Sequence, residues 1–253
     1  VSTPSNSLIK SVLTDSKIQS AESIFISGRY AYIAAFYAFR LVVVDIVDPL
    51  NPKIVGSVYD AELLQSAQSV TVSGNYAYVA ARGSHRLTIV DISNPINPVI
   101  VGSVRSTDHL VGAFSVRVAG AYAYVAGYVY NTLAIVDVSN PSNPVIKGSI
   151  RDSVKLEGAY SVDVVGSYAY VTARNGHVTV VDISRPTAPV IVGFLSGVSK
   201  LNGASYLQVS GSYAYVTAYN AKCFVIVNIS NPSSPLIAGS VCDPNQLNGP
   251  GVV

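Results

Sequence analysis

Eight side chains in variable segments of this sequence have the chemistry of a binding surface. They are tyrosines, arginines and histidines in short connections between apolar stretches: Tyr37, Arg82, His85, Tyr128, Tyr130, Arg174, His177 and Tyr219. Aromatic rings beside cationic groups are what proteins use to hold sugars or the surface of another protein. These residues therefore predict a binding site for a protein or a glycan.

The residue pattern gives little support to catalytic or metal chemistry. His85, His109 and His177 have no cysteine or second histidine at the spacing of a zinc site. The sequence has no nucleophile elbow, phosphate-binding loop or glycine-rich dinucleotide motif. We expect a protein that is not an enzyme and that holds no metal or cofactor.

The elements that must position the eight side chains are copies of one repeat. The signature Gly-x-Tyr-Ala-Tyr begins at five glycines spaced by 46, 46, 46 and 45 residues: Gly28, Gly74, Gly120, Gly166 and Gly211. A period of this length indicates a repeat architecture, and it takes precedence over any reading of single segments.

Each repeat contains four apolar, β-branched stretches. In the second repeat they are residues 69–72, 76–81, 86–92 and 99–104, separated by clusters of Gly, Asn, Pro and Ser. The prolines of the last turn cannot join a central ladder, so they mark its ends. Each repeat is therefore predicted to be a four-stranded antiparallel meander.

Both faces of such a meander are apolar or small, so neighbouring repeats must cover them. We predict an all-β fold, a β-propeller in which four-stranded blades pack face to face around an axis, rather than an open solenoid. The whole chain, 1–253, is predicted to be a single domain. Complete blades are expected at about 23–58, 69–104, 115–150, 161–195 and 206–241.

Two further segments resemble single strands of a split partial sixth blade. Residues 8–12 align with the fourth strand of a repeat, and 250–253 align with the first. We favour a six-bladed ring whose missing strands come from further sequence or from another subunit. The alternative is a five-bladed ring that closes alone.

The connections between strands fall into two groups, one on each face of the predicted propeller. The turns between the first and second strands and between the third and fourth strands are nearly the same in all repeats. The other connections differ in every repeat and contain the eight candidate side chains. Because equal structural demands do not explain this divergence, any ligand or partner is expected on the variable face.

An acidic residue ends the third strand of four repeats, and an asparagine replaces it in the fifth. These residues are Asp45, Asp91, Asp137, Asp182 and Asn228. A carboxylate or amide at this point can accept backbone N–H groups of the following proline turn, so we interpret the set as structural and not as a cation site.

Two pairs of residues are predicted to meet across strands. The hairpin register of the fifth repeat places Cys223 directly opposite Cys242, at a separation that predicts a disulfide and hence an oxidising compartment. Arg117 and Asp163 share one register in consecutive repeats, which predicts an ion pair between blades.

The third strands also carry a family resemblance. Residues 41–45, 87–91, 133–137 and 178–182 read LVVVD, LTIVD, LAIVD and VTVVD, and the fifth repeat departs from them with FVIVN at 224–228. With the Pro-x-x-Pro turns and Tyr-Ala-Tyr strands, the chain resembles the LVIVD-repeat family. The resemblance implies a propeller of bacterial or archaeal surface or secreted proteins, mostly without assigned activity.

Composition narrows the function classes. Hydrophobic residues make up 49% of the chain and charged residues 12%, and the net charge is only +2. No dense Lys/Arg stripe is present for nucleic acid, and no apolar run reaches the roughly 18 residues of a membrane span. We expect an extracellular or cell-surface propeller that is a rigid, non-catalytic binding or structural module.

Two other functions remain open at this point. One is a self-assembling subunit of a surface layer or filament, which associates with copies of itself through strand edges or flat faces. The other is a carbohydrate-binding or enzymatic propeller that uses the variable face.

Overall fold

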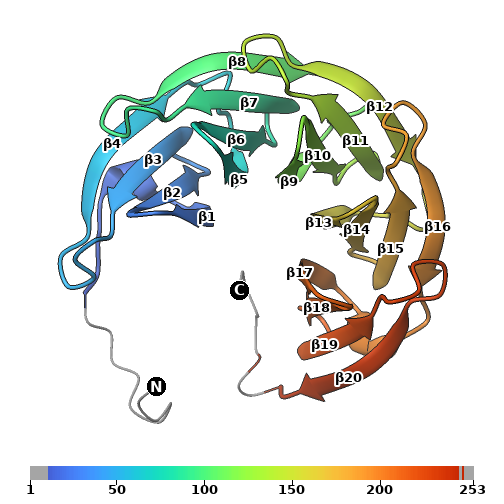
Figure 1. The fold of residues 1–253 in the computed structure, drawn as a ribbon. Helices are drawn as coiled ribbons and strands as arrows, with labels where there is room; N and C mark the ends of the chain where they lie inside the picture. The colour runs from blue at the N-terminus through green and yellow to red at the C-terminus, as the bar shows by residue number, and fades with distance from the viewer. Residues whose placement is uncertain (1–10, 245–246, 248–253) are drawn as a thin grey trace.

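The computed structural model describes residues 11–244 and 247. Within these residues the chain forms five separate antiparallel sheets, and in each sheet four consecutive strands pair in sequence order. Figure 1 shows the sheets side by side around an axis, with the first strand of each sheet innermost and the fourth outermost. This is the predicted β-propeller architecture.

The strand bounds follow the predicted blades to within about two residues. The first sheet contains β1 (Ala21–Ser27), β2 (Tyr30–Ala35), β3 (Arg40–Asp45) and β4 (Lys53–Tyr59). The second contains β5 (Ala67–Ser73), β6 (Tyr76–Ala81), β7 (Arg86–Asp91) and β8 (Val99–Arg105). The third contains β9 (Ala113–Ala119), β10 (Tyr122–Gly127), β11 (Thr132–Asp137) and β12 (Val145–Arg151). The fourth contains β13 (Ala159–Val165), β14 (Tyr168–Ala173), β15 (His177–Asp182) and β16 (Val190–Leu195). The fifth contains β17 (Ala204–Ser210), β18 (Tyr213–Ala218), β19 (Cys223–Asn228) and β20 (Leu236–Cys242). Two short 3₁₀ helices, η2 (Ser16–Ile18) and η3 (Ser199–Leu201), precede the first and fifth sheets.

Apolar side chains fill the space between neighbouring sheets. Between the first and second sheets, Tyr32, Leu41 and Val43 pack against Val70 and Val79, and all five are almost fully buried. Equivalent clusters separate the second from the third sheet, the third from the fourth, and the fourth from the fifth. The hydrophobic core is therefore divided into layers, and each layer belongs to two sheets at once.

A serine hydroxyl also joins each inner strand to the next. The Oγ atom of Ser23 accepts the backbone N–H of Val70 at 3.2 Å, and Ser161 Oγ accepts that of Leu207 at 3.3 Å. Ser69 and Ser115 make the same contact with the sheets that follow them. These bonds set the height of neighbouring sheets along the axis.

The acceptor at the end of each third strand stabilises the turn that follows it. Asp91 Oδ1 accepts the backbone N–H of Ser93 at 2.8 Å, and Asn228 Oδ1 accepts that of Ser230 at 2.9 Å. The corresponding atoms of Asp45, Asp137 and Asp182 make the same bond. The bond from Ser93 lowers the pKa of Asp91 below its usual value, because it stabilises the ionised carboxylate.

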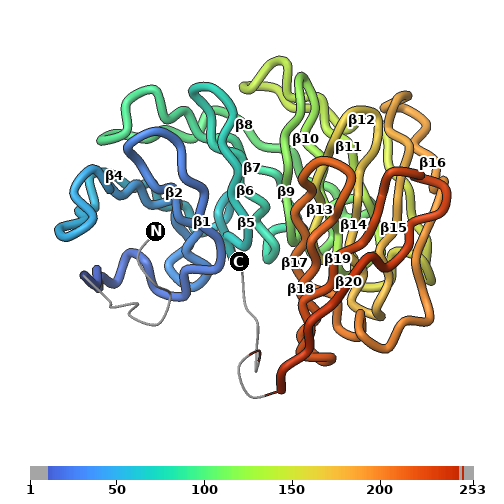
Figure 2. Tube along the Cα trace, turned by 60° about the horizontal axis from the view of Figure 1, so that its bottom comes forward, coloured from blue at the N-terminus to red at the C-terminus, as the bar shows by residue number. Residues whose placement is uncertain are grey.

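The ring formed by the described residues is open. In Figures 1 and 2 the first and fifth sheets lie apart, with no sheet between them. Part of each outward face is exposed: Ile24 is 54% exposed, whereas Val70, its equivalent in the second sheet, is 4% exposed. The middle of the first sheet's outward face is covered, because Ala31 and Val42 are buried in a cluster with Leu13 and Ile18 of the segment that precedes the sheet. On the fifth sheet, Tyr215 and Phe224 are half-buried, although Tyr32 and Leu41 at the equivalent positions are buried.

The sixth blade therefore stays a prediction. The expected strand at 250–253 lies outside the described residues, as do residues 8–10 of the strand expected at 8–12. Residues 11 and 12 are not in a strand, so the described part of that expectation is wrong. Ser11 instead donates a hydrogen bond from its hydroxyl to the Pro49 carbonyl, 2.7 Å away.

Four glycines of the outermost strands lie directly under the proline turn of the next sheet. They are Gly56, Gly102, Gly148 and Gly193, and a β-carbon at any of them would overlap the backbone carbonyl of Pro95, Pro141, Pro186 or Pro232. Gly239 holds the same place in β20, but no atom would approach a β-carbon there. The fifth sheet thus keeps a glycine that its present surroundings do not require.

This difference supplies a matched pair of variants. Gly148→Ala forces the fourth sheet away from the third and should lower the free energy of unfolding by about 1–3 kcal/mol. Gly239→Ala should change it by less than about 0.5 kcal/mol, as at an ordinary surface site. Urea unfolding of both variants measures the difference, and equal losses would contradict the packing described here.

The predicted disulfide is confirmed. Cys223 and Cys242 are directly opposed in the β19–β20 ladder and are bonded, with their Cα atoms 4.1 Å apart. The bond ties the outermost strand of the fifth sheet to its neighbour at the point where the ladder ends.

Removing this bond should destabilise the protein by about 3 kcal/mol, because the disulfide limits the unfolded chain over a loop of 19 residues. The measurement is urea unfolding of the Cys223→Ser, Cys242→Ser double variant against the wild type. Thiol titration of the unreduced, denatured wild type serves as the control. Two reactive thiols in that control would show that the bond does not form.

Candidate functional site

A cavity of about 280 Å³ collects side chains from the first four sheets. Its lining, called here the arginine–aromatic pocket, consists of Glu22, Phe36, Tyr37, Gln68, Arg82, Phe114, Tyr128, Tyr160 and Arg174. All but Tyr37 come from two repeat positions, each used once by every one of the four sheets. The pocket is thus built by the repeat itself. The first position holds four different residue types, and the second holds Phe, Arg, Tyr and Arg.

The first repeat position is a β-bulge near the start of the innermost strand. In the first sheet Ala21 pairs with Ala35 and Ser23 with Ala34, which leaves Glu22 as the extra, unpaired residue. The same shift leaves Gln68, Phe114 and Tyr160 unpaired in the next three sheets. Because a bulge interrupts the alternation of the strand, it can turn these four side chains toward the pocket.

The second repeat position directly follows the second strand of each sheet. Phe36, Arg82, Tyr128 and Arg174 occupy it, at intervals of 46 residues. This is one of the connections of the predicted variable face. The structure therefore brings the variable loops of four sheets to one place.

Arginine side chains stack on the aromatic rings of the pocket. The guanidinium carbon of Arg82 lies 5.3 Å from the ring centre of Phe114 and 5.7 Å from that of Tyr128. The guanidinium carbon of Arg174 lies 5.4 Å from the ring centre of Tyr160. Phe114 and Tyr160 are themselves in contact, with ring centres 4.0 Å apart. These cation–π contacts use none of the guanidinium N–H donors, which are free to bond a ligand.

Neither arginine forms an ion pair with a carboxylate in the part of the chain that the structure describes. The Glu22 carboxylate is instead held by neutral groups: it accepts hydrogen bonds from Ser20 Oγ at 2.9 Å and Gln68 Nε2 at 3.3 Å. Gln68 is only 5% exposed, so this amide is fixed in place. The pocket thus has a cationic, aromatic side and a polar side.

Two tyrosines extend the aromatic side toward the fifth sheet. The rings of Tyr160 and Tyr206 meet edge to face at 5.4 Å, and their hydroxyls are hydrogen-bonded to each other. Burial raises the pKa of both phenols above the usual value. They are therefore neutral at physiological pH and serve as hydrogen-bonding groups rather than as bases.

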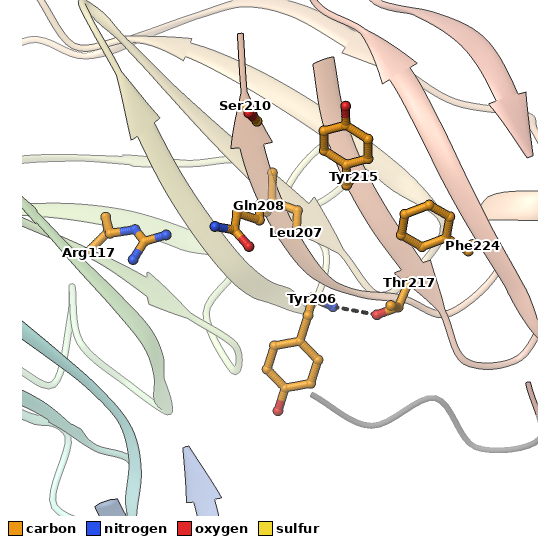
Figure 3. A pocket seen from close by; sticks show the side chains of 8 residues that line it. All are labelled: Arg117, Tyr206, Leu207, Gln208, Ser210, Tyr215, Thr217 and Phe224. Carbon is orange, nitrogen blue, oxygen red and sulfur yellow. Dashed lines mark hydrogen bonds between the residues drawn. The ribbon is translucent and has the colours of Figure 1, made fainter. Parts of the chain in front are cut away.

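A larger cavity, of about 420 Å³, lies against the outward face of the fifth sheet (Figure 3). Its lining comprises Arg117, Tyr206, Leu207, Gln208, Ser210, Tyr215, Thr217 and Phe224. Tyr215 and Phe224 hold positions that are buried under the next sheet elsewhere in the ring. We interpret this cavity as half of an inter-sheet core and not as a ligand site.

The ion pair predicted between blades is confirmed. Arg117 Nε lies 2.7 Å from Asp163 Oδ1, and Asp163 Oδ2 accepts the backbone N–H of Val209 at 2.8 Å. Three consecutive inner strands, β9, β13 and β17, are therefore joined by one carboxylate. This pairing occupies Arg117, the only charged residue of the larger cavity.

The structure groups half of the eight predicted binding residues. Tyr37, Arg82, Tyr128 and Arg174 line the arginine–aromatic pocket, whereas His85, Tyr130, His177 and Tyr219 do not.

The two histidines outside the pocket contact the backbone. His85 Nδ1 accepts the Gly112 backbone N–H at 3.2 Å, and His177 Nδ1 lies 3.0 Å from the Val154 carbonyl oxygen. Tyr130 instead lies under Arg151, and Tyr219 is 49% exposed. No group of three or more His, Cys, Asp or Glu residues able to hold a metal occurs among residues 11–244 and 247.

Sequence reasoning missed Glu22, Phe36, Gln68 and Phe114 and left Tyr160 out of the site. A signal for the bulge residues was available, because this register position reads Glu, Gln, Phe and Tyr in the first four inner strands. In those strands only the position that holds Arg117 and Asp163 varies as widely. The alternation of residues along each strand predicts ordinary pairing at this position. It therefore did not reveal the bulge that can turn these side chains toward the pocket.

Five four-stranded blades arranged around an axis, with the variable loops on one face, define a β-propeller repeat protein. The LVIVD repeat model matches the chain at residues 19–60, 65–106, 112–152, 158–195 and 203–243, and the chain belongs to this family. No curated protein matches it in sequence.

Solved structures share the fold at low sequence identity. A Lactobacillus plantarum protein has a TM-score of 0.75 at 11% identity, over 89% of this chain and 72% of its own. The periplasmic gluconolactonase of Pseudomonas aeruginosa has a TM-score of 0.73 at 12% identity, over 87% and 70%. A functionally unknown protein from Desulfotomaculum acetoxidans has a TM-score of 0.71 at 14% identity, over 91% and 74%. At these identities the likeness establishes the fold alone.

Proposed function

We propose that the chain is a rigid, non-catalytic binding module of an extracellular or cell-surface protein, and that it binds its ligand in the arginine–aromatic pocket. The observation that carries the proposal is convergence: two variable repeat positions from four sheets line one cavity. By contrast, the strand cores and the turns of the opposite face are nearly uniform among the repeats. Differences that gather at one cavity point to selection for its chemistry.

The pocket is held in shape before any ligand arrives. The apolar layers and the serine bonds fix neighbouring sheets relative to one another. Phe114 is 6% exposed, and its ring is clamped between Tyr160 and Arg82. Rigid aromatic groups lose little conformational entropy on binding, so ordering the site costs little of the binding free energy.

The non-catalytic part of the proposal rests on how the polar groups are engaged. Glu22 is bonded to Ser20 and Gln68, and Tyr160 and Tyr206 are kept neutral by burial. A general base would need a group that is free to take a proton near neutral pH. The described pocket offers hydrogen-bond donors and ring faces instead.

The cellular location is inferred from the disulfide. Such bonds persist in oxidising compartments and are rare in the cytosol. None of the helices in the described part of the chain is long and apolar enough to cross a bilayer. Secretion or display at a cell surface accounts for the disulfide.

A screen with a face-specific control tests the proposed function. Wild type, Tyr128→Ala and Arg29→Ala are compared on a glycan array and, by ligand-observed NMR, against a library of small polar molecules. Arg29 lies on the opposite rim, where it pairs with Asp45. We expect ligands of the wild type to bind Tyr128→Ala at least 10-fold more weakly and Arg29→Ala equally well. Ligands lost with Arg29→Ala and kept by Tyr128→Ala would overturn the proposal.

Self-assembly is a second candidate function, favoured by exposed apolar side chains on the outward faces of the first and fifth sheets. On the first sheet these lie on the innermost strand, because Leu13 and Ile18 cover the middle of that face. Ile24 and Ile26 on one face and Phe224 on the other are the types of side chain that the internal layers bury. A contact between the first sheet of one copy and the fifth sheet of the next is heterologous, so it leads to a filament. In Figure 1 the gap between the first and fifth sheets is narrower than a whole molecule, so a second copy does not fit into it in the plane of the ring. Successive copies would therefore be displaced along the axis.

Sedimentation over a range of concentrations tests this candidate. An assembling protein should show a mass that rises with concentration, and Phe224→Lys should reduce the association at least 10-fold. Ile96→Lys, at an exposed residue in the β7–β8 turn of the second sheet, is the control. A wild type that stays monomeric at high concentration would rule the candidate out.

A further inference from the structure

We propose that the arginine–aromatic pocket takes an acidic monosaccharide unit, a uronic acid, whose carboxylate is bound by Arg82 and Arg174. This inference rests on the proposed binding function and names the class of its ligand.

The first argument is charge. Two guanidinium cations and the single carboxylate of Glu22 leave the pocket lining with one net positive charge. The complement is a ligand with one negative charge. A uronate carries one, whereas a sugar phosphate carries closer to two at neutral pH.

The second argument is the direction of the free donors. The guanidinium carbons of Arg82 and Arg174 lie over the rings of Phe114, Tyr128 and Tyr160, and such cation–π contacts use none of the N–H donors. The N–H edges remain available, and a planar carboxylate matches such an edge with two parallel hydrogen bonds. No described carboxylate already occupies them within ion-pair distance.

The third argument is the Glu22 carboxylate, which lines the same cavity as the arginines. It still has acceptor capacity, and the bonded Gln68 amide keeps it fixed. A sugar can therefore donate a hydroxyl to Glu22 while its carboxylate binds the arginines. Tyr37, which is 66% exposed, supplies a further ring face at the rim.

The fourth argument is size. The cavity of about 280 Å³ lies at the lower end of the roughly 300–1,000 Å³ typical of small-molecule sites. It accommodates one sugar ring. A longer acidic glycan would therefore place a single residue in the pocket and continue over the exposed rim.

Calorimetric titration with matched ligands tests the inference. The probes are glucuronate and galacturonate, their neutral counterparts glucose and galactose, acetate as a carboxylate without a ring, and glucose 6-phosphate as a dianion. We expect the uronates to bind at least 10-fold more tightly than every other probe. Their affinity should fall as salt is raised, because the bonds involve partly exposed charges.

Arginine variants locate the carboxylate. Arg82→Gln and Arg174→Gln keep a hydrogen-bonding side chain but remove the charge, and each should weaken uronate binding about 10-fold or more. Each variant should weaken the binding of uronates more than that of the neutral sugars, so the preference for uronates should fall. Arg29→Gln, on the opposite rim, should leave all affinities unchanged. Circular dichroism and urea unfolding show whether each variant keeps the fold.

The outcomes distinguish failure of the proposed ligand class from failure of the proposed binding function. Neutral sugars that bind as tightly as uronates, or equal binding of acetate, would overturn the ligand class. Tighter binding of glucose 6-phosphate would overturn it as well. No binding of any probe, together with Tyr128-dependent ligands in the wider screen, would refute the uronic acid and leave the binding function in place. If no probe binds and the wider screen finds no Tyr128-dependent ligand, both proposals are refuted.

Discussion

Burial of apolar surface between neighbouring sheets is the interaction on which the rest of this structure depends. A single four-stranded meander has two apolar faces and gains little stability alone, so each sheet is stabilised mainly by the next. The repeat meets this demand with the same side chains in each layer, such as Tyr32 and Leu41 against Val70. Uniform layers leave the loops at the two rims and the axis-facing positions of the inner strands outside the core, and the repeats diverge at those places.

The arginine–aromatic pocket follows from this separation between a uniform core and variable positions outside it. A propeller brings equivalent residues of every blade close to its axis, so one bulged position per repeat is enough to create a lining of four different side chains. The bulge matters because it frees one residue from the ladder while the flanking residues stay paired. Glu22, Gln68, Phe114 and Tyr160 can therefore vary in chemistry without any change in the sheet that holds them.

Much of the fold could be predicted from the sequence, because the repeat states the same pattern five times. The strands, the sheet order and the register that opposes Cys223 to Cys242 all follow from period, alternation and turn residues. The site was harder to predict. Loop composition indicated Arg82, Tyr128 and Arg174, but which loop residues point inward depends on the bulges and on the curvature of the ring. His85 and His177 show the limit: they lie in the right loops but contact nearby backbone atoms.

The gap between the first and fifth sheets affects how the two ends of the arginine–aromatic pocket are connected. Glu22 belongs to the first sheet and Arg174 follows a strand of the fourth, so three inter-sheet layers in series set the distance between them. Among the described residues, no layer joins the fifth sheet back to the first, so there is no second path around the ring. A ligand that contacts both residues would supply such a path, and part of its binding free energy would then stabilise the whole arc of sheets against unfolding.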